Sequence, residues 1–206
     1  MGACIMKLEE LFRQYSKHNG FHNIMPISNI PSVIQHGILS NELAAQYAHK
    51  SVAMNEVQQR RDKVQIPNGL ALHQYANLYF DARNPMMYLR QDEDICVLKV
   101  SDSILNLPDV ILSDQNASSQ YARFYEPAIG ITKLNFSMIY ATSWTDDDYI
   151  CYWRKKGAKC AEVLVPNRVP YEYIVSAAVK NENDKNKLIE LGYTKPVLII
   201  PELFFK

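Results

Sequence analysis

The sequence lacks the patterns that mark several common protein classes. No apolar run approaches the length of a membrane span, and the start of the chain has neither the apolar segment nor the cleavage site of a secretory signal. Met6 stands where a myristoylation motif requires serine or threonine. The four cysteines show no metal-ligand spacing and have no nearby histidine partner. We therefore expect a cytoplasmic protein with reduced cysteines, no metal and no membrane partner.

A net charge is also absent. The 22 basic and 22 acidic residues cancel, so no overall field draws the protein towards nucleic acid, and any such binding depends on a local patch. Residues 154–168 form one, with a single acid, Glu162, among five basic residues: Arg154, Lys155, Lys156, Lys159 and Arg168. The 206 residues, 48% of them apolar, suffice for a sizeable core. We expect one domain over residues 1–206.

Neither repeats nor a regular strand–helix–strand alternation is evident, which favours an α+β domain with an antiparallel or mixed sheet. Alternating or short apolar runs predict strands at residues 21–27, 70–80, 94–100, 110–112, 160–165, 169–179 and 197–200. Helical spacing and capping residues predict helices at 6–17, 28–37, 41–54, from 85 onward, and from Asn183 or Asp184 to Gly192. Residues 55–69 are typical of a solvated loop, and residues 113–127 of a polar turn followed by a short helix.

The stretch from Arg154 to Pro166, RKKGAKCAEVLVP, has the strongest chemical interest. A basic loop with a turn at Gly157 is expected to precede a strand, with Glu162 near its start on the same face as Cys160 and Leu164. A carboxylate among small apolar neighbours is partly desolvated and is a candidate for chemistry. The alternative is an edge-strand acid that prevents aggregation.

Two other segments have polar groups suited to an anionic ligand. Arg60 and Arg61 either extend from a solvated loop or present guanidinium groups to a pyrophosphate or carboxylate. The short helix expected from Ser28 or Asn29 directly follows a strand, so the N–H groups at its start can meet an anion, unless it is an ordinary capped helix.

Several blocks together resemble a known family. In order along the chain they are FHNIMPISNIPSVIQHGILS (21–40), QQRRDKV (58–64), LHQYANLYFDARNPMMY (72–88), SDQNAS (113–118) and AEVLVP (161–166). Their order and spacing resemble the DarT family, bacterial toxins that transfer ADP-ribose from NAD to a base in single-stranded DNA. The blocks cover most of the chain between residues 21 and 175.

The resemblance implies an ADP-ribosyltransferase-like fold in which a split β-sheet core grips NAD in a cleft. The family's catalytic glutamate maps onto Glu162, its essential arginine onto Arg61 or Arg60, with Arg61 favoured, and a polar residue of the site onto Asn116. Its adenosine and ribose contacts map onto His22, Asn23 and Asn29. The chain has one more residue than usual between His22 and Asn29, so either His22 or Asn23 takes the family's histidine position, and Gln115 replaces a more usual glycine.

A protein that binds single-stranded DNA uses aromatic side chains to stack on the bases and basic side chains to contact the phosphates. The candidates are Tyr75, Arg83, Arg154, Lys155 and Lys156. Tyr75 is equally suited to packing in the core, and residues 154–156 to a solvated loop.

We expect a mono-ADP-ribosyltransferase toxin that modifies one DNA base, with thymine favoured over guanine as the predicted target, together with a macrodomain antitoxin; both the base and the antitoxin are implied by the resemblance. The alternatives are an NAD-using enzyme with protein, RNA or water as acceptor, and a catalytically silent nucleotide- or DNA-binding module.

Overall fold

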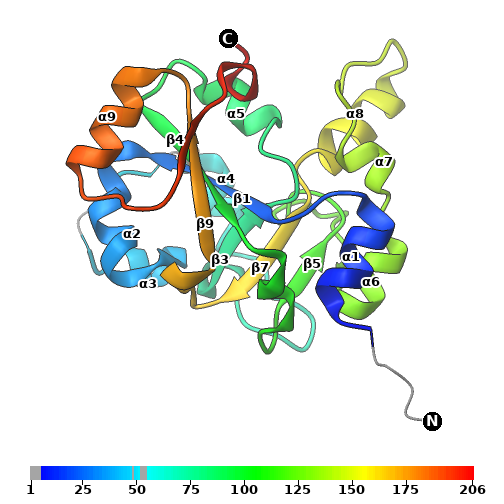
Figure 1. The fold of residues 1–206 in the computed structure, drawn as a ribbon. Helices are drawn as coiled ribbons and strands as arrows, with labels where there is room; N and C mark the ends of the chain where they lie inside the picture. The colour runs from blue at the N-terminus through cyan, green and yellow to red at the C-terminus, as the bar shows by residue number, and fades with distance from the viewer. Residues whose placement is uncertain (1–5, 48, 52–54) are drawn as a thin grey trace.

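The computed structural model describes residues 6–47, 49–51 and 55–206, and within these ranges the chain is organised around a mixed β-sheet (Figure 1). In spatial order its strands are β10 (Val197–Ile199), β9 (Ile174–Val179), β4 (Ile95–Val100), β1 (Phe21–Pro26), β3 (Tyr75–Tyr79), β7 (Glu162–Pro166), β5 (Ile111–Ser113) and β6 (Phe124–Tyr125). β10 and β9 are parallel, and the other neighbouring pairs are antiparallel. The short strands β2 (Ile38–Leu39) and β8 (Arg168–Val169) pair separately. The predicted α+β class with a mixed sheet is confirmed.

The sheet is divided into two halves at its centre. β1 pairs with β4 along its whole length, and β3 with β7 likewise, but in the described ranges β1 and β3 share one registered pair, His22 with Tyr79. Beyond this pair the two strands are no longer hydrogen-bonded to each other in register, so the half-sheet β10-β9-β4-β1 separates from the half-sheet β3-β7-β5-β6. The split sheet that the family resemblance implies is present.

Helices flank each half of the sheet (Figure 1). Near β9 and β4 lie α2 (Ile30–His36), α3 (Asn41–Ala44) and α9 (Glu182–Glu190). On the side of β5 lie α1 (Leu8–Ser16), α6 (Pro127–Lys133) and α7 (Phe136–Ile139), and α8 (Tyr149–Ala158) packs next to α7. The remaining described helices are α4 (Asn55–Arg61) and α5 (Pro85–Arg90). Pro85 begins α5 because its fixed φ suits a first helical position, and the Asn84 side chain caps this helix by accepting the Met87 N–H at 3.0 Å. No described helix combines the length and apolarity needed to cross a bilayer.

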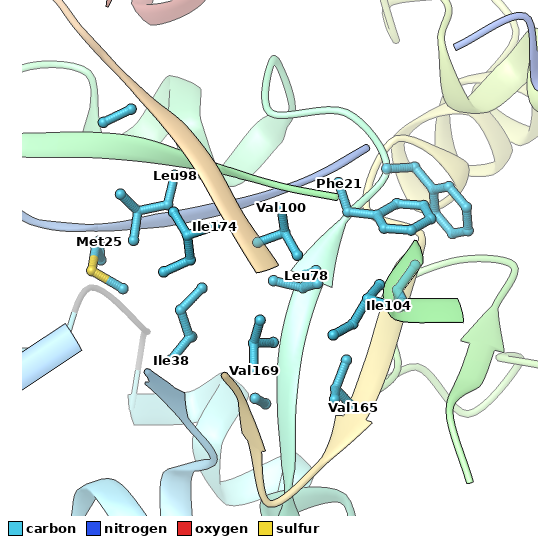
Figure 2. Packing of buried hydrophobic residues seen from close by; sticks show 14 of the residues in the cluster. Phe21, Met25, Ile38, Leu78, Leu98, Val100, Ile104, Val165, Val169 and Ile174 are labelled. Atoms are coloured by element: carbon cyan, nitrogen blue, oxygen red, sulfur yellow. The ribbon is translucent and has the colours of Figure 1, made fainter. Parts of the chain in front are cut away.

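The main hydrophobic core joins both half-sheets (Figure 2). Leu78 of β3 and Val165 of β7 belong to the same buried cluster as Leu98 of β4, and Ile38 and Val169 of the β2–β8 pair pack beside them. Burial of these side chains contributes about 1.5–3 kcal/mol each. The core therefore fixes the two half-sheets relative to each other even where they are not hydrogen-bonded.

Most of the predicted strands are confirmed, but several local predictions were wrong. Residues 55–61 form helix α4 and not a solvated loop, and residues 154–158 belong to α8, so the expected turn at Gly157 lies inside a helix. Phe124 and Tyr125 form β6 where a helix was predicted, because they pair with Leu112 and Ser113.

Two predicted helices have different limits. The helix predicted over 41–54 is observed at Asn41–Ala44, and residues 48 and 52–54 lie outside the described ranges. The cap of α9 is Asn181, whose side chain accepts the Asp184 N–H at 2.9 Å, not Asn183 or Asp184.

Candidate active site

Glu162 lies at the first position of β7, as predicted, and is completely buried. Its partner across the sheet is Tyr79, the same residue that pairs with His22 where the two half-sheets meet. Ala161 and Val163, on either side of Glu162, point into the main core and anchor the strand. The carboxylate is therefore held by a rigid element at the point where the sheet divides.

Arg61, the last residue of α4, binds this carboxylate. Its Nη1 donates to Oε1 and Oε2 of Glu162 at 3.1 and 3.0 Å, and its side chain is 8% exposed. A buried acid is tolerated when a guanidinium neutralises it and satisfies its oxygens. The pair joins residues 101 positions apart in the sequence.

A polar turn after β5 completes the surroundings of the carboxylate. The backbone N–H of Ala117 donates to Glu162 Oε1 at 2.9 Å, and Ser113 Oγ accepts the Glu162 N–H at 3.1 Å. Asn116 Oδ1 accepts from both the N–H and the hydroxyl of Ser118, at 2.9 and 2.7 Å, which fixes the turn. Asn116 thus orients the Ala117 N–H in addition to lining the adjacent cavity.

Burial keeps two neighbouring groups neutral. It raises the pKa of the Cys160 thiol to about 12, with a further contribution from the Glu162 charge. The same two causes, burial first, raise the pKa of Tyr79 well above its ordinary value. At neutral pH both groups therefore remain protonated, and Cys160 is not a thiolate nucleophile.

A cavity of about 310 Å³ is lined by Arg61; its partner Glu162 is completely buried behind it and is not among the described residues that line the cavity. Its walls come from both half-sheets and from α2, α4 and α5, and include Asn23, Asn29, Arg61, Tyr79, Asn116 and Cys160. Such a volume is in the range of small-molecule and cofactor pockets. The cavity occupies the split between β1 and β3, so the division of the sheet creates the space for a ligand.

His22 and Asn23 bridge the two half-sheets in different ways. His22 Nδ1 lies 3.1 Å from the Phe80 carbonyl, and Asn23 Nδ2 donates to the Asn77 carbonyl at 3.0 Å. Asn23 is among the residues that line the cavity and His22 is not. The Asn23 side chain is nearly buried, and its Oδ1, which is shielded from solvent, has no hydrogen-bond partner within the described structure. Buried acceptors are normally paired, so this oxygen is an unsatisfied group at the cavity wall.

Asn29 also lines the cavity. Its amide donates to the Lys50 carbonyl at 2.7 Å and accepts the Lys50 N–H at 3.0 Å. These two hydrogen bonds hold the backbone of Lys50, which also lines the cavity, against the start of α2. The Asn29 side-chain amide thus contributes to the cavity by holding the Lys50 backbone.

The two arginines of α4 differ in position. Arg60 is exposed and is not among the described residues that line the cavity, whereas Arg61 faces Glu162. The geometry thus selects Arg61 from the predicted pair. The reason is helical periodicity, because neighbouring residues of a helix point about 100° apart.

Two of the predicted DNA contacts are engaged within the protein. Tyr75 is 2% exposed, and its hydroxyl accepts the Leu70 N–H at 3.1 Å, so its ring packs with the core and lines the cavity.

Arg83 donates to the carbonyls of Thr142 and Glu202, at 3.2 and 3.1 Å, and lies 4.1 Å above the Phe205 ring. Arg83 therefore ties the loop before α8 to the last residues of the chain.

The basic residues 154–156 project from α8. Arg154 is exposed, and Lys155 is paired with Asp146 at 2.6 Å. Lys156 donates to the Tyr152 hydroxyl at 3.1 Å and lies over the Trp153 ring. Within the described ranges no three His, Cys, Asp or Glu side chains cluster as metal ligands would.

Several residues of the site were not predicted from the sequence. Tyr79 meets Glu162 through strand register, Ala117 through its backbone N–H, and Ser113 through its hydroxyl, which accepts the Glu162 N–H. No residue pattern reveals these contacts. One signal was available, because Ser113 directly follows the predicted strand 110–112 and opens the SDQNAS block.

Comparison with known proteins gives consistent results. The family model DarT, described as ssDNA thymidine ADP-ribosyltransferase, matches residues 22–205. A DNA ADP-ribosyl transferase–glycohydrolase fusion protein of Thermosipho africanus is 27% identical over 93% of this chain and 50% of its own length, so the chain spans about half of that relative. A DNA ADP-ribosyl transferase of a Thermus species is 24% identical over 87% of this chain and 90% of its own.

Solved structures agree with these matches. Thermosipho africanus DarTG in complex with ADP-ribose superposes with a TM-score of 0.80 at 28% identity, over 91% of this chain and 51% of that one. Thermus sp. 2.9 DarT in complex with ADP-ribosylated ssDNA gives a TM-score of 0.79 at 23% identity, over 92% and 97%. The predicted ADP-ribosyltransferase-like fold is confirmed. Because the family model covers nearly the whole sequence, the chain belongs to the DarT family.

Proposed function

We propose that this chain is an NAD-dependent mono-ADP-ribosyltransferase that modifies thymine in single-stranded DNA. The observation that carries the proposal is the buried Glu162, held by the Ala117 N–H and by Arg61, which itself lines a 310 Å³ cavity. The cavity is lined by residues from Asn23 to Cys160, which supports one catalytic unit over residues 1–206. The descriptions of the matched family and relatives support the acceptor class.

The reaction exchanges one glycosidic bond for another. The bond between ribose C1′ and the nicotinamide nitrogen breaks, and its electron pair leaves with nicotinamide, which loses its positive charge. Glu162 stabilises the oxocarbenium-like state by its negative charge and by a hydrogen bond to a ribose hydroxyl. The thymine ring nitrogen then bonds to C1′, and its proton passes to the Glu162 carboxylate and on to water.

Arg61 and Asn23 would hold the dinucleotide. Arg61 forms part of the cavity wall, and its guanidinium has five N–H donors, more than the carboxylate of Glu162 uses. The remaining donors suit the pyrophosphate. Asn23 Oδ1 suits an amide or amino N–H of NAD, because it is a buried acceptor in the same cavity. Binding at two such points fixes the sugar relative to Glu162 and lowers the entropic barrier.

The DNA strand would approach along α8. Arg154 and Lys156 lie within a helix that leads to Glu162, and their charges are suited to phosphates. Lys155 contributes less, because Asp146 neutralises it. Neutralising Lys156 should weaken DNA binding more at low salt than at high salt and should leave NAD affinity unchanged.

A glycohydrolase partner accords with this activity. By its name, the Thermosipho relative joins a DNA ADP-ribosyl transferase to a DNA ADP-ribosyl glycohydrolase in one chain. We propose that this chain is a toxin with a macrodomain antitoxin that removes the modification. The test is to incubate modified oligonucleotide with a DNA ADP-ribosyl glycohydrolase; release of ADP-ribose is expected, and a fully resistant product would contradict the proposal.

The acceptor is tested with labelled NAD and four substrates: single-stranded DNA, duplex DNA, RNA and protein. Label should enter thymine-containing single strands and not matched strands in which thymine is replaced by cytosine. Glu162→Gln should abolish labelling while the variant still folds and unfolds in one cooperative thermal transition, although at a lower temperature. Label on RNA or protein alone would reject the acceptor, nicotinamide release without label would indicate water as acceptor, and no turnover of NAD would favour a binding module.

A further inference from the structure

The exposed face of α8 has an aromatic cluster that the proposed reaction does not yet use. Tyr149 is 73% exposed and Trp153 is 50% exposed, and their ring centroids are 6.0 Å apart. Tyr152 lies edge-on to Trp153 at 5.3 Å. Exposed aromatic side chains that gather on one helix surface, as these do, are typical of interaction sites.

The side chain of Lys156 places a positive charge beside these rings. Lys156 Nζ lies 4.9 Å from the Trp153 ring centroid and 5.3 Å from that of Tyr152. Its hydrogen bond goes to the neutral Tyr152 hydroxyl, so this contact leaves its charge uncompensated, whereas Lys155 is paired with Asp146. Aromatic faces beside a cation fit the two repeating parts of a single strand of nucleic acid, the base and the phosphate.

The cluster continues towards the catalytic cavity. Tyr149, Trp153 and Lys156 are spaced by four and three residues, which places them along one side of α8, and Cys160 follows in the turn after the helix. Cys160 lines the cavity, and the charge of Lys156 acts on its thiol.

Gly157 packs so closely on Gln115 that a Cβ atom would lie 2.8 Å from Gln115 Oε1. The inner end of α8 therefore contacts the turn that binds Glu162.

We propose that Tyr149 and Trp153 stack with bases that flank the target thymine in single-stranded DNA, while Lys156 pairs with a neighbouring phosphate. This inference rests on the proposed function and adds the subsite that positions the strand. It also explains a preference for single strands, because in a duplex the base faces are already stacked on each other and cannot reach these rings.

Fluorescence measures the binding step separately from transfer. The chain has two tryptophans, so Trp144→Phe leaves Trp153 as the sole tryptophan. A thymine-containing single strand should quench its emission in a saturable, salt-dependent manner, and a duplex of the same sequence should not. Unchanged emission at saturating single strand would overturn the proposal.

Kinetics then test the role of the ring. Trp153→Ala should raise KM for the oligonucleotide about tenfold, with kcat and the KM for NAD within about twofold, and Trp153→Phe should restore most of the loss. Tyr15→Ala is the matched control, since Tyr15 is 49% exposed on α1 and should have no effect. An unchanged oligonucleotide KM in Trp153→Ala, or an equal loss of NAD affinity, would overturn the subsite. Quenching without any transfer by the unmodified chain would support the DNA surface and reject the proposed reaction.

Discussion

The ion pair between Arg61 and Glu162 allows stability and catalysis to be separated by a double-mutant cycle. The variants are Glu162→Gln, Arg61→Met and the two combined. Glutamine keeps an oxygen that can accept the Ala117 N–H but removes the charge that faces Arg61. Methionine removes the guanidinium and fills part of its volume.

The structure sets the expected magnitudes. Removing one partner of a buried ion pair typically costs about 3–5 kcal/mol, because the other charge is left without compensation. Arg61 lines the cavity, where water can solvate it, so we expect the lower end, about 3 kcal/mol, for Glu162→Gln. The combined variant leaves no isolated charge and should be about 2 kcal/mol more stable than the sum of the single losses predicts.

Urea unfolding gives the free energies, and nicotinamide release gives the activity. All three variants should lose at least about a hundredfold in kcat. Glu162→Gln and the combined variant lack the negative charge beside the ribose, and in Arg61→Met the Glu162 carboxylate is no longer oriented. Additive stability losses would show that the two side chains do not interact as described. Recovery of transfer in the combined variant would refute the catalytic role of the pair.

Three further predictions concern the surrounding residues. Asn23→Ala should raise KM for NAD about three- to tenfold, whereas His22→Gln should change it by less than about twofold, as measured by initial rates at varied NAD. Burial lowers the pKa of His22 below its ordinary value, so the unfolded chain binds the proton more readily: thermal stability should fall as the pH drops below about 6.5, and His22→Gln should reduce that fall. Lys159→Met should lower the free energy of unfolding by about 2 kcal/mol, because buried Lys159 contacts Asp81 and donates to the Ala141 carbonyl at 2.9 Å.

Each of these three predictions has a control or a result that would contradict it. A larger KM effect from His22 than from Asn23 would reverse their assignment. A pH profile of stability unchanged in His22→Gln would show that another group titrates. Lys156→Met is the control for Lys159→Met, since Lys156 is only half-buried; equal losses in the two variants would contradict a structural role for the buried lysine.

The strand framework was predictable because strand signals are local. Alternation around Ile95–Val100 and the apolar run after Cys160 indicate β4 and β7, and Glu162 is placed at the start of β7 by that run. Its burial among small apolar neighbours followed from the same pattern. The selection of Arg61 over Arg60, by contrast, depends on the orientation of α4, which a segment with few apolar residues does not reveal.

Other features depend on contacts that are remote in sequence. Residues 55–61 have little apolar periodicity, and α4 is stabilised in part where Arg61 binds Glu162, 101 residues away. Gly157 indicated a turn, but as a glycine it also lets α8 approach Gln115 closely, and that contact was not visible in the sequence. Tyr75 was a candidate for DNA stacking, and only the packing of β3 showed that it is buried.

The central claim is that Glu162 and Arg61 act on one NAD molecule in the cavity between the half-sheets. A crystal structure with a non-reactive NAD analogue tests it most directly. We predict that the nicotinamide ribose lies within hydrogen-bonding distance of Glu162 and that Arg61 contacts the same dinucleotide. A dinucleotide bound outside this cavity, or bound with its nicotinamide ribose beyond the reach of Glu162, would contradict the claim.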